Sequence, residues 1–348
     1  MIHFEVDSCG ALAFRADTAV NTRLADRHRR SKALLDRLVS GQGKVRLPGP
    51  SDVLARHPAA HALVAFQDGY VKQDQASALL SLLGRLDAGR IDRLGSGAMC
   101  VLQEQALLPA VDTRGESIRV DPAAPEDARA LDHFMEQLES VVGEAWVAFR
   151  SIVNTVSLVV VPGLPDIPHF SGSTNDIWAA MHMTLPATAA IVAESVTHEA
   201  AHFWLHAVEE IGALAENAWT DERWVSPWRE DPRPIAGIIH GVHVFSCAAA
   251  VLSCWLIRGS THVDGPDERV PRRVATMLAQ VEEGISEVRR CGRATPVGAG
   301  IVDASERRLS VPRAALPDDL LAAARENISR RRAGKIQRWS QRGLCFSA

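Results

Sequence analysis

The stretch SVTHEAAHFWLHAVEE, residues 195–210, places His198 and His202 four residues apart around Glu199 and adds His206 four residues later. In an α-helix, residues at i and i+4 project from one face a turn apart, so His198 and His202 can direct ring nitrogens at one metal ion. Glu199 lies beside that face, where its carboxylate can accept a hydrogen bond from a metal-bound water. This HExxH spacing predicts a metal-binding helix.

The sequence around this helix predicts its structural support. The β-rich runs TVSLVVV (155–161) and IWAAMHMTL (177–185) predict two strands, the second at a sheet edge where an extended peptide can pair. The segment from Pro234 to Ile257 has no formally charged side chain and predicts a second, buried helix. Apolar residues at helical spacing predict further helices at 21–39, 52–66, 74–89, 125–152, 267–290 and 317–331.

These elements predict an α+β fold that is mainly helical. Its centre is a metal-binding core, made of the HExxH helix, a small β-sheet and a second buried helix, with extra N- and C-terminal helices. We expect an N-terminal helical region at residues 1–120 and a metal-binding catalytic region with the C-terminal helices at residues 121–348.

Composition narrows the class of protein. The chain has 348 residues, and its net charge of -4 gives no reason to expect nucleic acid or an anionic membrane as a partner. The N-terminus lacks the basic start and apolar run of an export signal, and the six cysteines form no CxxC pair. We therefore predict a cytoplasmic protein without a disulfide framework, whose oligomeric state the sequence leaves open.

A third metal ligand has to come from outside the HExxH pair. The metzincin extension is excluded, because Leu205 and Val208 stand where it needs glycine and histidine. His206 lies about 12 Å along the helix axis from His198, too far for His198, His202 and His206 together to bind one ion. His240, in GIIHG on the uncharged helix, is the best candidate, and His243 and Glu222 are alternatives. Glu216 also has the spacing of a gluzincin glutamate but lies in or near a loop.

Two arginines suggest what else binds near the metal. If the second helix begins near Pro234, Arg233 lies two turns before His240 on the same face, about 10 Å away. A guanidinium at that distance suits a dicarboxylate that chelates the metal at one end and is clamped at the other. Arg229 is a second candidate for this role. Two histidines and a third ligand with open positions also suit the iron(II) of an oxygenase.

The segments THEAAH and SPWREDPRPIAGIIHGVHVF together resemble the family of HExxH-motif peptide-modification proteins of bacterial ribosomal-peptide (RiPP) pathways. The resemblance covers residues 151–258, and the second segment is the more specific. It implies that the metal-binding core is zincin-like and that the protein is a non-haem iron(II), 2-oxoglutarate-dependent oxygenase that uses O2 to hydroxylate a side-chain carbon of a ribosomally made precursor peptide. By position it implies His198, His202 and His240 as iron ligands, Arg229 and Arg233 as co-substrate residues, and Glu199 as a supporting group.

Two other functions stay open at this point. A zinc metallopeptidase would use the same His198 and His202, Glu199 as the general base, and His240 or Glu222 as third ligand. A peptide-binding scaffold without catalysis would use the basic segment RENISRRRAGKIQRWSQR (325–342) to contact an acidic leader peptide.

Overall fold

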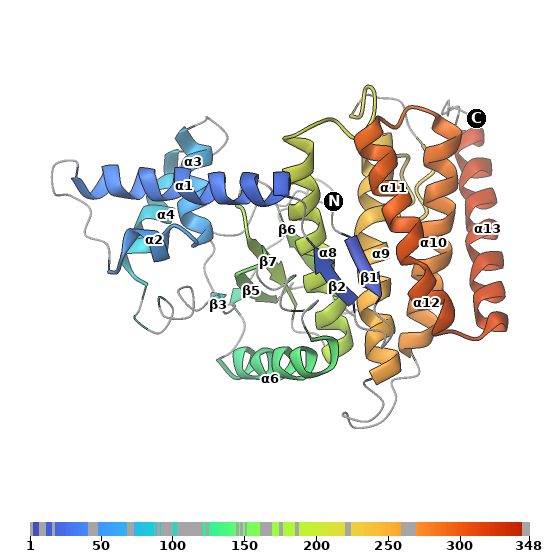
Figure 1. Cartoon of the computed structure of the whole chain (residues 1–348), viewed down its shortest axis with the longest axis horizontal. Helices are drawn as coiled ribbons and strands as arrows, with labels where there is room; N and C mark the ends of the chain where they lie inside the picture. Colours follow the sequence, from blue (N-terminus) through green and yellow to red (C-terminus); the bar gives the residue numbers. More distant parts are fainter. Residues whose placement is uncertain are drawn as a thin grey trace. The chain divides into compact units, whose positions relative to one another are not determined.

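The computed structural model shows two compact units, each built from several segments of the chain (Figure 1). One unit, called the sheet unit here, contains residues 18–137 and 147–204; the other, the helical unit, contains residues 1–17, 138–146 and 205–348. The structure describes residues 3–6, 12–15, 18–40, 48–67, 73–86, 88, 91, 100–102, 121–122, 125–143, 146, 149, 152–160, 169–173, 177–184, 188–219, 224–258 and 269–342.

Four helices open the sheet unit and confirm the helical character predicted for this region. They are α1 (Thr18–Ser40), α2 (Ser51–Leu54), α3 (Pro58–Gln67) and α4 (Gln73–Gly84). Leucine and alanine side chains at helical spacing form their shared core, which includes the fully buried Leu35, Leu54, Leu79 and Leu83. Burial of apolar surface of this kind is what stabilises such short helices.

The sheet has the strand order β3-β5-β7-β6, with β4 pairing with β5 off this path. β5 is parallel to β3 and β7, whereas β6 is antiparallel to β7 and β4 is antiparallel to β5. The strands are β3 (Cys100–Leu102), β4 (Asp121–Pro122), β5 (Thr155–Val160), β6 (Ser171–Ser173) and β7 (Ala180–Met183).

The predicted strands at 155–161 and 177–185 are confirmed as β5 and β7, but the expected edge position of β7 is wrong. β6 pairs with β7 through Gly172 opposite His182, so β6 is the edge strand. The sequence missed β6 because Ser-Gly-Ser has low β-propensity and lies in a segment rich in turn residues. The segment SIRVD (117–121) also predicts a strand, and most of it lies outside the described residues, apart from Asp121 in β4.

Two helices run from one unit into the other in the chain. The helix α6 (Pro125–Val142) is amphipathic, and the HExxH helix α8 (Ala189–Glu209) is continuous. On α8 the residues between the histidines are buried, among them Ala200, Ala201 and Phe203. The histidines themselves lie on one partly exposed stripe.

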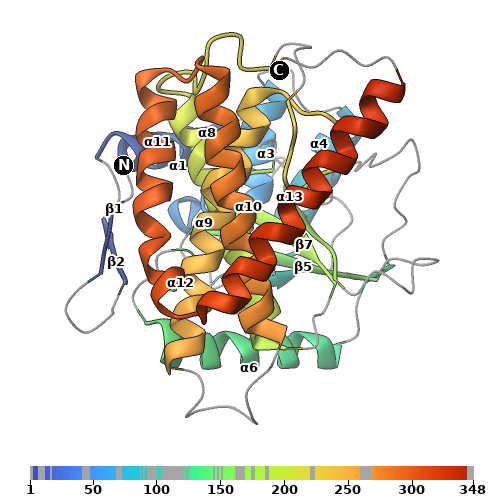
Figure 2. The same ribbon diagram turned by 90° about the vertical axis from the view of Figure 1, so that its right-hand side faces the viewer.

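The helical unit surrounds α9 (Ile235–Arg258), the predicted second buried helix. Its most apolar window is long enough to cross a membrane, but 89% of that window is buried, as in the core helix of a soluble protein. The helices α10 (Arg269–Cys291), α11 (Pro296–Arg308) and α12 (Ser310–Ala314) pack on α9. The helix α13 (Asp318–Gln341) packs on α10 and crosses it obliquely (Figure 2). The helices α11 and α12 and the hairpin β1 (His3–Val6) with β2 (Leu12–Arg15) were not predicted.

The described residues are mainly helical with one small mixed sheet and one hairpin, which confirms the predicted α+β class in its coarse form. The zincin-like character of the core stays a prediction. Neither unit ends at residue 120, since both combine distant segments, and the boundary proposed between residues 120 and 121 also stays a prediction. The described cysteines Cys247, Cys254 and Cys291 are free thiols.

Candidate metal centre

The partly exposed stripe of α8 carries His198, His202 and His206 one turn apart, followed by Glu209. These four side chains lie on one helix face, because each is three or four residues from the one before it. Since α8 is one continuous helix, the unit boundary within it does not change this spacing. The stripe therefore offers three imidazoles and a carboxylate in a row.

His198 and His202 form the pair that the HExxH spacing predicts. Their Nε2 atoms lie 3.2 Å apart, and their rings meet edge to face at a centroid distance of 4.8 Å. Two nitrogens bound to one ion at about 2.1 Å each stand about 3.0–3.4 Å apart. The observed separation suits a shared metal ion and equally a shared proton.

A second convergence lies one turn further along α8. One ligand atom each from His202, His206 and His240 come within 4.8 Å of one another. This upper bound is wider than the separation of about 3.0–3.4 Å between two nitrogens bound to one ion, so binding would require the rings to move closer together. Among the described residues, this set of three could hold a metal ion, and His198 lies outside it.

Glu209 joins His206 to His240 within the helical unit. Its Oε2 atom lies 3.2 Å from His206 Nδ1 and 3.2 Å from His240 Nε2. Burial would raise the pKa of Glu209, but the hydrogen bonds to His206 and His240 outweigh it and lower the pKa to about 2. The carboxylate is therefore ionised beside the two rings at any physiological pH.

His240 is the buried member of the group, with 5% of its surface exposed. It lies on α9 with its ring 5.1 Å from that of His206 and 5.7 Å from that of Trp219. Burial lowers the pKa of His240 more than its bond to Glu209 raises it, so the ring is neutral at pH 7. A neutral imidazole is the form that binds a metal ion.

Glu199 is held by the edge strand of the sheet. Ser171 donates a hydrogen bond of 3.0 Å to its Oε1 and Ser173 donates one of 2.6 Å to its Oε2. Gly172 lies between the two serines, and a Cβ there would come within 2.7 Å of His182 Nε2. Both carboxylate oxygens of Glu199 are thus engaged by β6, and a glycine is needed at its centre.

Arg233 and Arg229 share one partner, because Arg233 Nη1 also lies 3.5 Å from Asp231 Oδ2. Arg233 pairs its backbone with Trp224 in an isolated β-bridge, and its Nε lies 3.6 Å from where a Cβ on Gly237 would be. The Arg233 charge is near enough to lower the pKa of His240. Arg229 donates to Asp231 at 2.9 Å and is exposed. Arg233 is therefore the better placed of the two for a ligand that also reaches His240.

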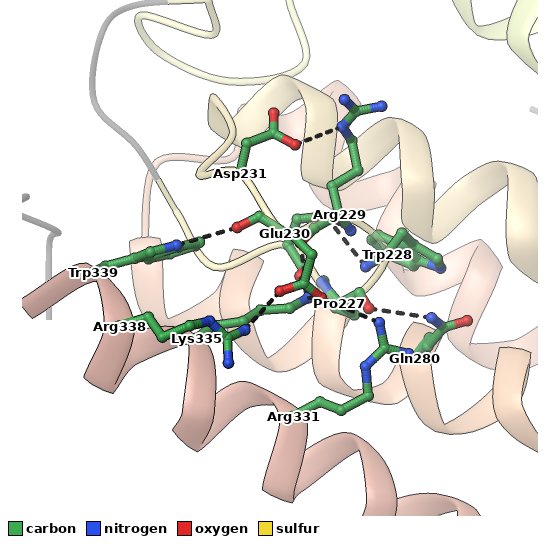
Figure 3. A network of polar contacts seen from close by, with 11 residues as sticks. Pro227, Trp228, Arg229, Glu230, Asp231, Gln280, Arg331, Lys335, Arg338 and Trp339 are labelled. Carbon is green, nitrogen blue, oxygen red and sulfur yellow. Dashed lines mark hydrogen bonds and ion pairs between the residues drawn. The ribbon is translucent and has the colours of Figure 1, made fainter. Parts of the chain in front are cut away.

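The loop that carries these arginines is fixed by buried contacts (Figure 3). The ring of Trp228 stacks on Phe245 at 5.2 Å and fills the space left by the glycines of α9 and α10; a Cβ on Gly284 would come within 2.7 Å of it. Gln280 donates to the Pro227 carbonyl, and Lys335 donates to the carbonyls of Ser226 and Arg229. The segment SPWREDPRP is thus a rigid connection.

The alternative third ligands lie elsewhere. His243 is buried with its Nε2 atom 3.9 Å from Cys247 Sγ, and burial together with the Arg308 charge lowers its pKa. Glu216 is exposed, and its backbone N–H donates to Arg293. Glu222 lies outside the described residues.

Sequence reasoning missed two members of the cluster, His206 and Glu209. His206 was set aside because it is too far from His198, an argument that assumed His198 must be a ligand. The sequence contained a signal for both residues, because three histidines stand at i, i+4 and i+8 and an acid follows three residues later. This spacing allows the two metal ligands of the helix to be His202 and His206 as well as His198 and His202.

In comparisons with known proteins, no family model matches this chain, and no curated protein is similar to it. The chemistry of the site therefore has to be argued from its own residues. Three imidazoles and a carboxylate are ligand types that iron, zinc, copper and nickel all accept.

Proposed function

We propose that this chain is a metal-dependent enzyme, specifically an iron(II), 2-oxoglutarate-dependent oxygenase acting on a peptide. The observation that carries the proposal is the convergence of His202, His206 and His240, with Glu209 beside them. We assign these histidines as metal ligands in place of the set His198, His202 and His240. Both sets share His202 and His240, and they differ in which turn of α8 supplies the third ring.

The residues present fit a metal ion by their chemistry. His240 is buried and neutral. The histidines of α8 would supply the other ligands from a second helix. Non-haem iron(II) oxygenases more often use two histidines and one carboxylate. With three histidines as ligands, Glu209 would support His206 and His240 by hydrogen bonds and leave positions open for substrates. When bound, iron(II) supplies the chemistry that turns 2-oxoglutarate and O2 into succinate, CO2 and a hydroxylated carbon.

Two features support an oxygenase over a zinc peptidase. Glu199, which a peptidase would use as its general base, has both oxygens bonded to serines of β6. Arg233 lies against the first turn of α9, about two helix turns before His240. Its guanidinium can bind the distal carboxylate of 2-oxoglutarate. Arg229, bonded to Asp231, is left to support the loop.

The proposed substrate is a ribosomally made precursor peptide in an extended conformation. The strand β6, which carries the two serines that bind Glu199, lies at an edge of the sheet and is short and partly exposed. An extended peptide can add to such an edge through backbone hydrogen bonds. Trp219, which is 57% exposed beside His240, offers an aromatic surface for a substrate side chain.

Glu199→Gln separates the two enzyme classes. We expect the variant to retain metal and to form succinate from 2-oxoglutarate within about tenfold of the wild-type rate, because Glu199 only anchors α8 to β6. A general base contributes about 10²–10⁴-fold to a rate. Release of new amino termini from a peptide mixture by the wild-type protein, reduced to that degree in Glu199→Gln, would identify a peptidase instead.

A further inference from the structure

One face of α13 lines a surface pocket of about 290 Å³ in the helical unit. The pocket is formed by residues of α13 at helical spacing, together with one acid from the rigid loop: Asn327, Arg330, Arg331, Gly334, Arg338 and Glu230. Residues at i, i+4, i+7 and i+11 share a helix face, so these side chains form one continuous stripe. Three guanidinium groups and one carboxylate leave this pocket with an excess of positive charge.

The other basic residues of α13 are used by the fold. Arg325 binds Glu282, Arg332 binds Glu283, and Lys335 is buried against backbone carbonyls of the loop. The arginines of the pocket have no buried partner: Arg331 and Arg338 pair with Glu230, which is 62% exposed. Arg330 is 71% exposed and has only a distant pairing of 3.8 Å with Glu326.

Gly334 forms the middle of the stripe. A glycine inside a helix costs stability relative to alanine, so its presence on α13 has to be balanced by some benefit. A Cβ at this position would lie 3.3 Å from Arg338 Nη1, tighter than ordinary contact. The missing side chain leaves room beside Arg338 and between the guanidinium groups.

Glu230 shows which chemistry the pocket recognises. Its carboxylate accepts a hydrogen bond of 2.7 Å from Arg338 and a longer one of 3.4 Å from Arg331, yet the side chain remains 62% exposed. The backbone beneath it is fixed, because Trp339 Nε1 donates to the Glu230 carbonyl (Figure 3). The arginines thus already bind a carboxylate whose side chain is largely exposed to solvent.

From this geometry we propose that the α13 pocket binds the acidic side chains of an extended peptide segment, with Glu230 as an internal competitor. Guanidinium groups bind carboxylates through paired hydrogen bonds, which suits Arg330, Arg331 and Arg338. Positions 330 and 338 are about 12 Å apart along the helix. An extended chain covers that distance with acids about three or four residues apart, whereas a single small anion cannot reach both ends.

This inference goes beyond the proposed function and does not require the metal centre. It assigns a separate contact for a peptide on the helical unit, formed by α13 and Glu230 of the loop. Its test therefore uses binding to the full-length chain, without catalysis, and a failure here leaves the metal centre untouched.

The test is fluorescence anisotropy with a fluorescein-labelled hexaglutamate peptide at low ionic strength. We expect saturable binding that a hexalysine peptide with the same label does not show. The double variant Arg330→Gln/Arg331→Gln should weaken binding at least tenfold. Arg307→Gln, at an exposed arginine of α11, is the matched control and should leave the affinity unchanged. Absence of saturable binding, or equal loss in the control, overturns the proposal.

Two further variants and a competition with phosphate test what the pocket recognises. Glu230→Gln should tighten hexaglutamate binding severalfold, because it removes the competing carboxylate, whereas a purely structural pairing predicts no gain. Gly334→Leu should weaken binding by filling the pocket while keeping or raising the melting temperature of the protein. If inorganic phosphate displaces the peptide at equal concentration, the site recognises single anions and the peptide assignment is wrong.

Discussion

At the scale of single residues, the account depends on which turn of α8 faces His240. The HExxH pattern predicted a metal-binding helix at α8, and it named His202 and His240, which together with His206 form a group that could hold a metal ion. It could not show which of three equally spaced histidines meets α9. That choice depends on how α9 packs on the end of α8, and no local pattern in either segment encodes it.

Single substitutions decide between the two ligand sets. We expect His206→Ala to lose bound metal, because it removes a ring from the converging set, and His198→Ala to retain most of it. The measurement is metal content by elemental analysis after anaerobic loading with iron(II) and removal of free ion. His133→Ala, an exposed histidine on α6, is a control for surface binding. Loss of metal in His198→Ala with retention in His206→Ala would restore the HExxH pair.

At the scale of elements, the sequence predicted the long helices well and the short strands and helix ends poorly. The helices α8, α9 and α10 carry continuous apolar periodicity, so the pattern locates them within a few residues. The strand β6 is a three-residue Ser-Gly-Ser segment that becomes a strand only because β7 and Glu199 bind it. The end of α13 at Gln341, beyond the predicted 331, follows from the anchoring of Lys335 and Trp339.

The packing of the C-terminal helices depends on Glu282 of α10. This carboxylate binds Arg313 of α12 at 2.8 Å and Arg325 of α13 at 2.7 Å. Burial would raise the pKa of Glu282, but these two arginines outweigh it and lower the pKa. A folded-state pKa below the unfolded value gives stability that is present above the unfolded pKa and lost as the pH falls through the folded-state pKa.

We therefore expect Glu282→Gln to lower the free energy of unfolding by about 1 kcal/mol at pH 7, since both arginines are half exposed. The difference from wild type should shrink as the pH falls below about 4. Urea unfolding at a series of pH values measures it, with the exposed Glu326→Gln as control. A difference that stays constant down to pH 3 would show that the charge of Glu282 contributes nothing.

At the scale of the whole molecule, the chain forms two units from interleaved segments, an arrangement that composition and periodicity did not reveal. Contacts between residues far apart in sequence decide this, as with Ile177 in the core of the N-terminal helices. The proposed metal ligands on α8 and α9 also come from different segments, separated by a loop of the helical unit. Metal binding should consequently stabilise the folded chain.

A ligand that binds only the folded state adds about 2.7 kcal/mol of stability at a hundred times its dissociation constant. We expect a saturating metal ion, with cobalt(II) as an air-stable substitute, to raise the melting temperature of the wild-type protein by roughly 5 °C. His202→Ala should show no such rise. An equal shift in both proteins would place the bound metal away from this cluster.

The central claim is that this histidine cluster holds iron(II) together with 2-oxoglutarate. Anaerobic addition of 2-oxoglutarate to the iron(II)-loaded protein, followed by visible absorption, tests it most directly. We predict a weak charge-transfer band of a chelated 2-oxoacid, absent in His202→Ala and requiring more 2-oxoglutarate in Arg233→Ala. Iron bound to the wild-type protein without any such band, and unaffected by 2-oxoglutarate, would contradict the proposed oxygenase.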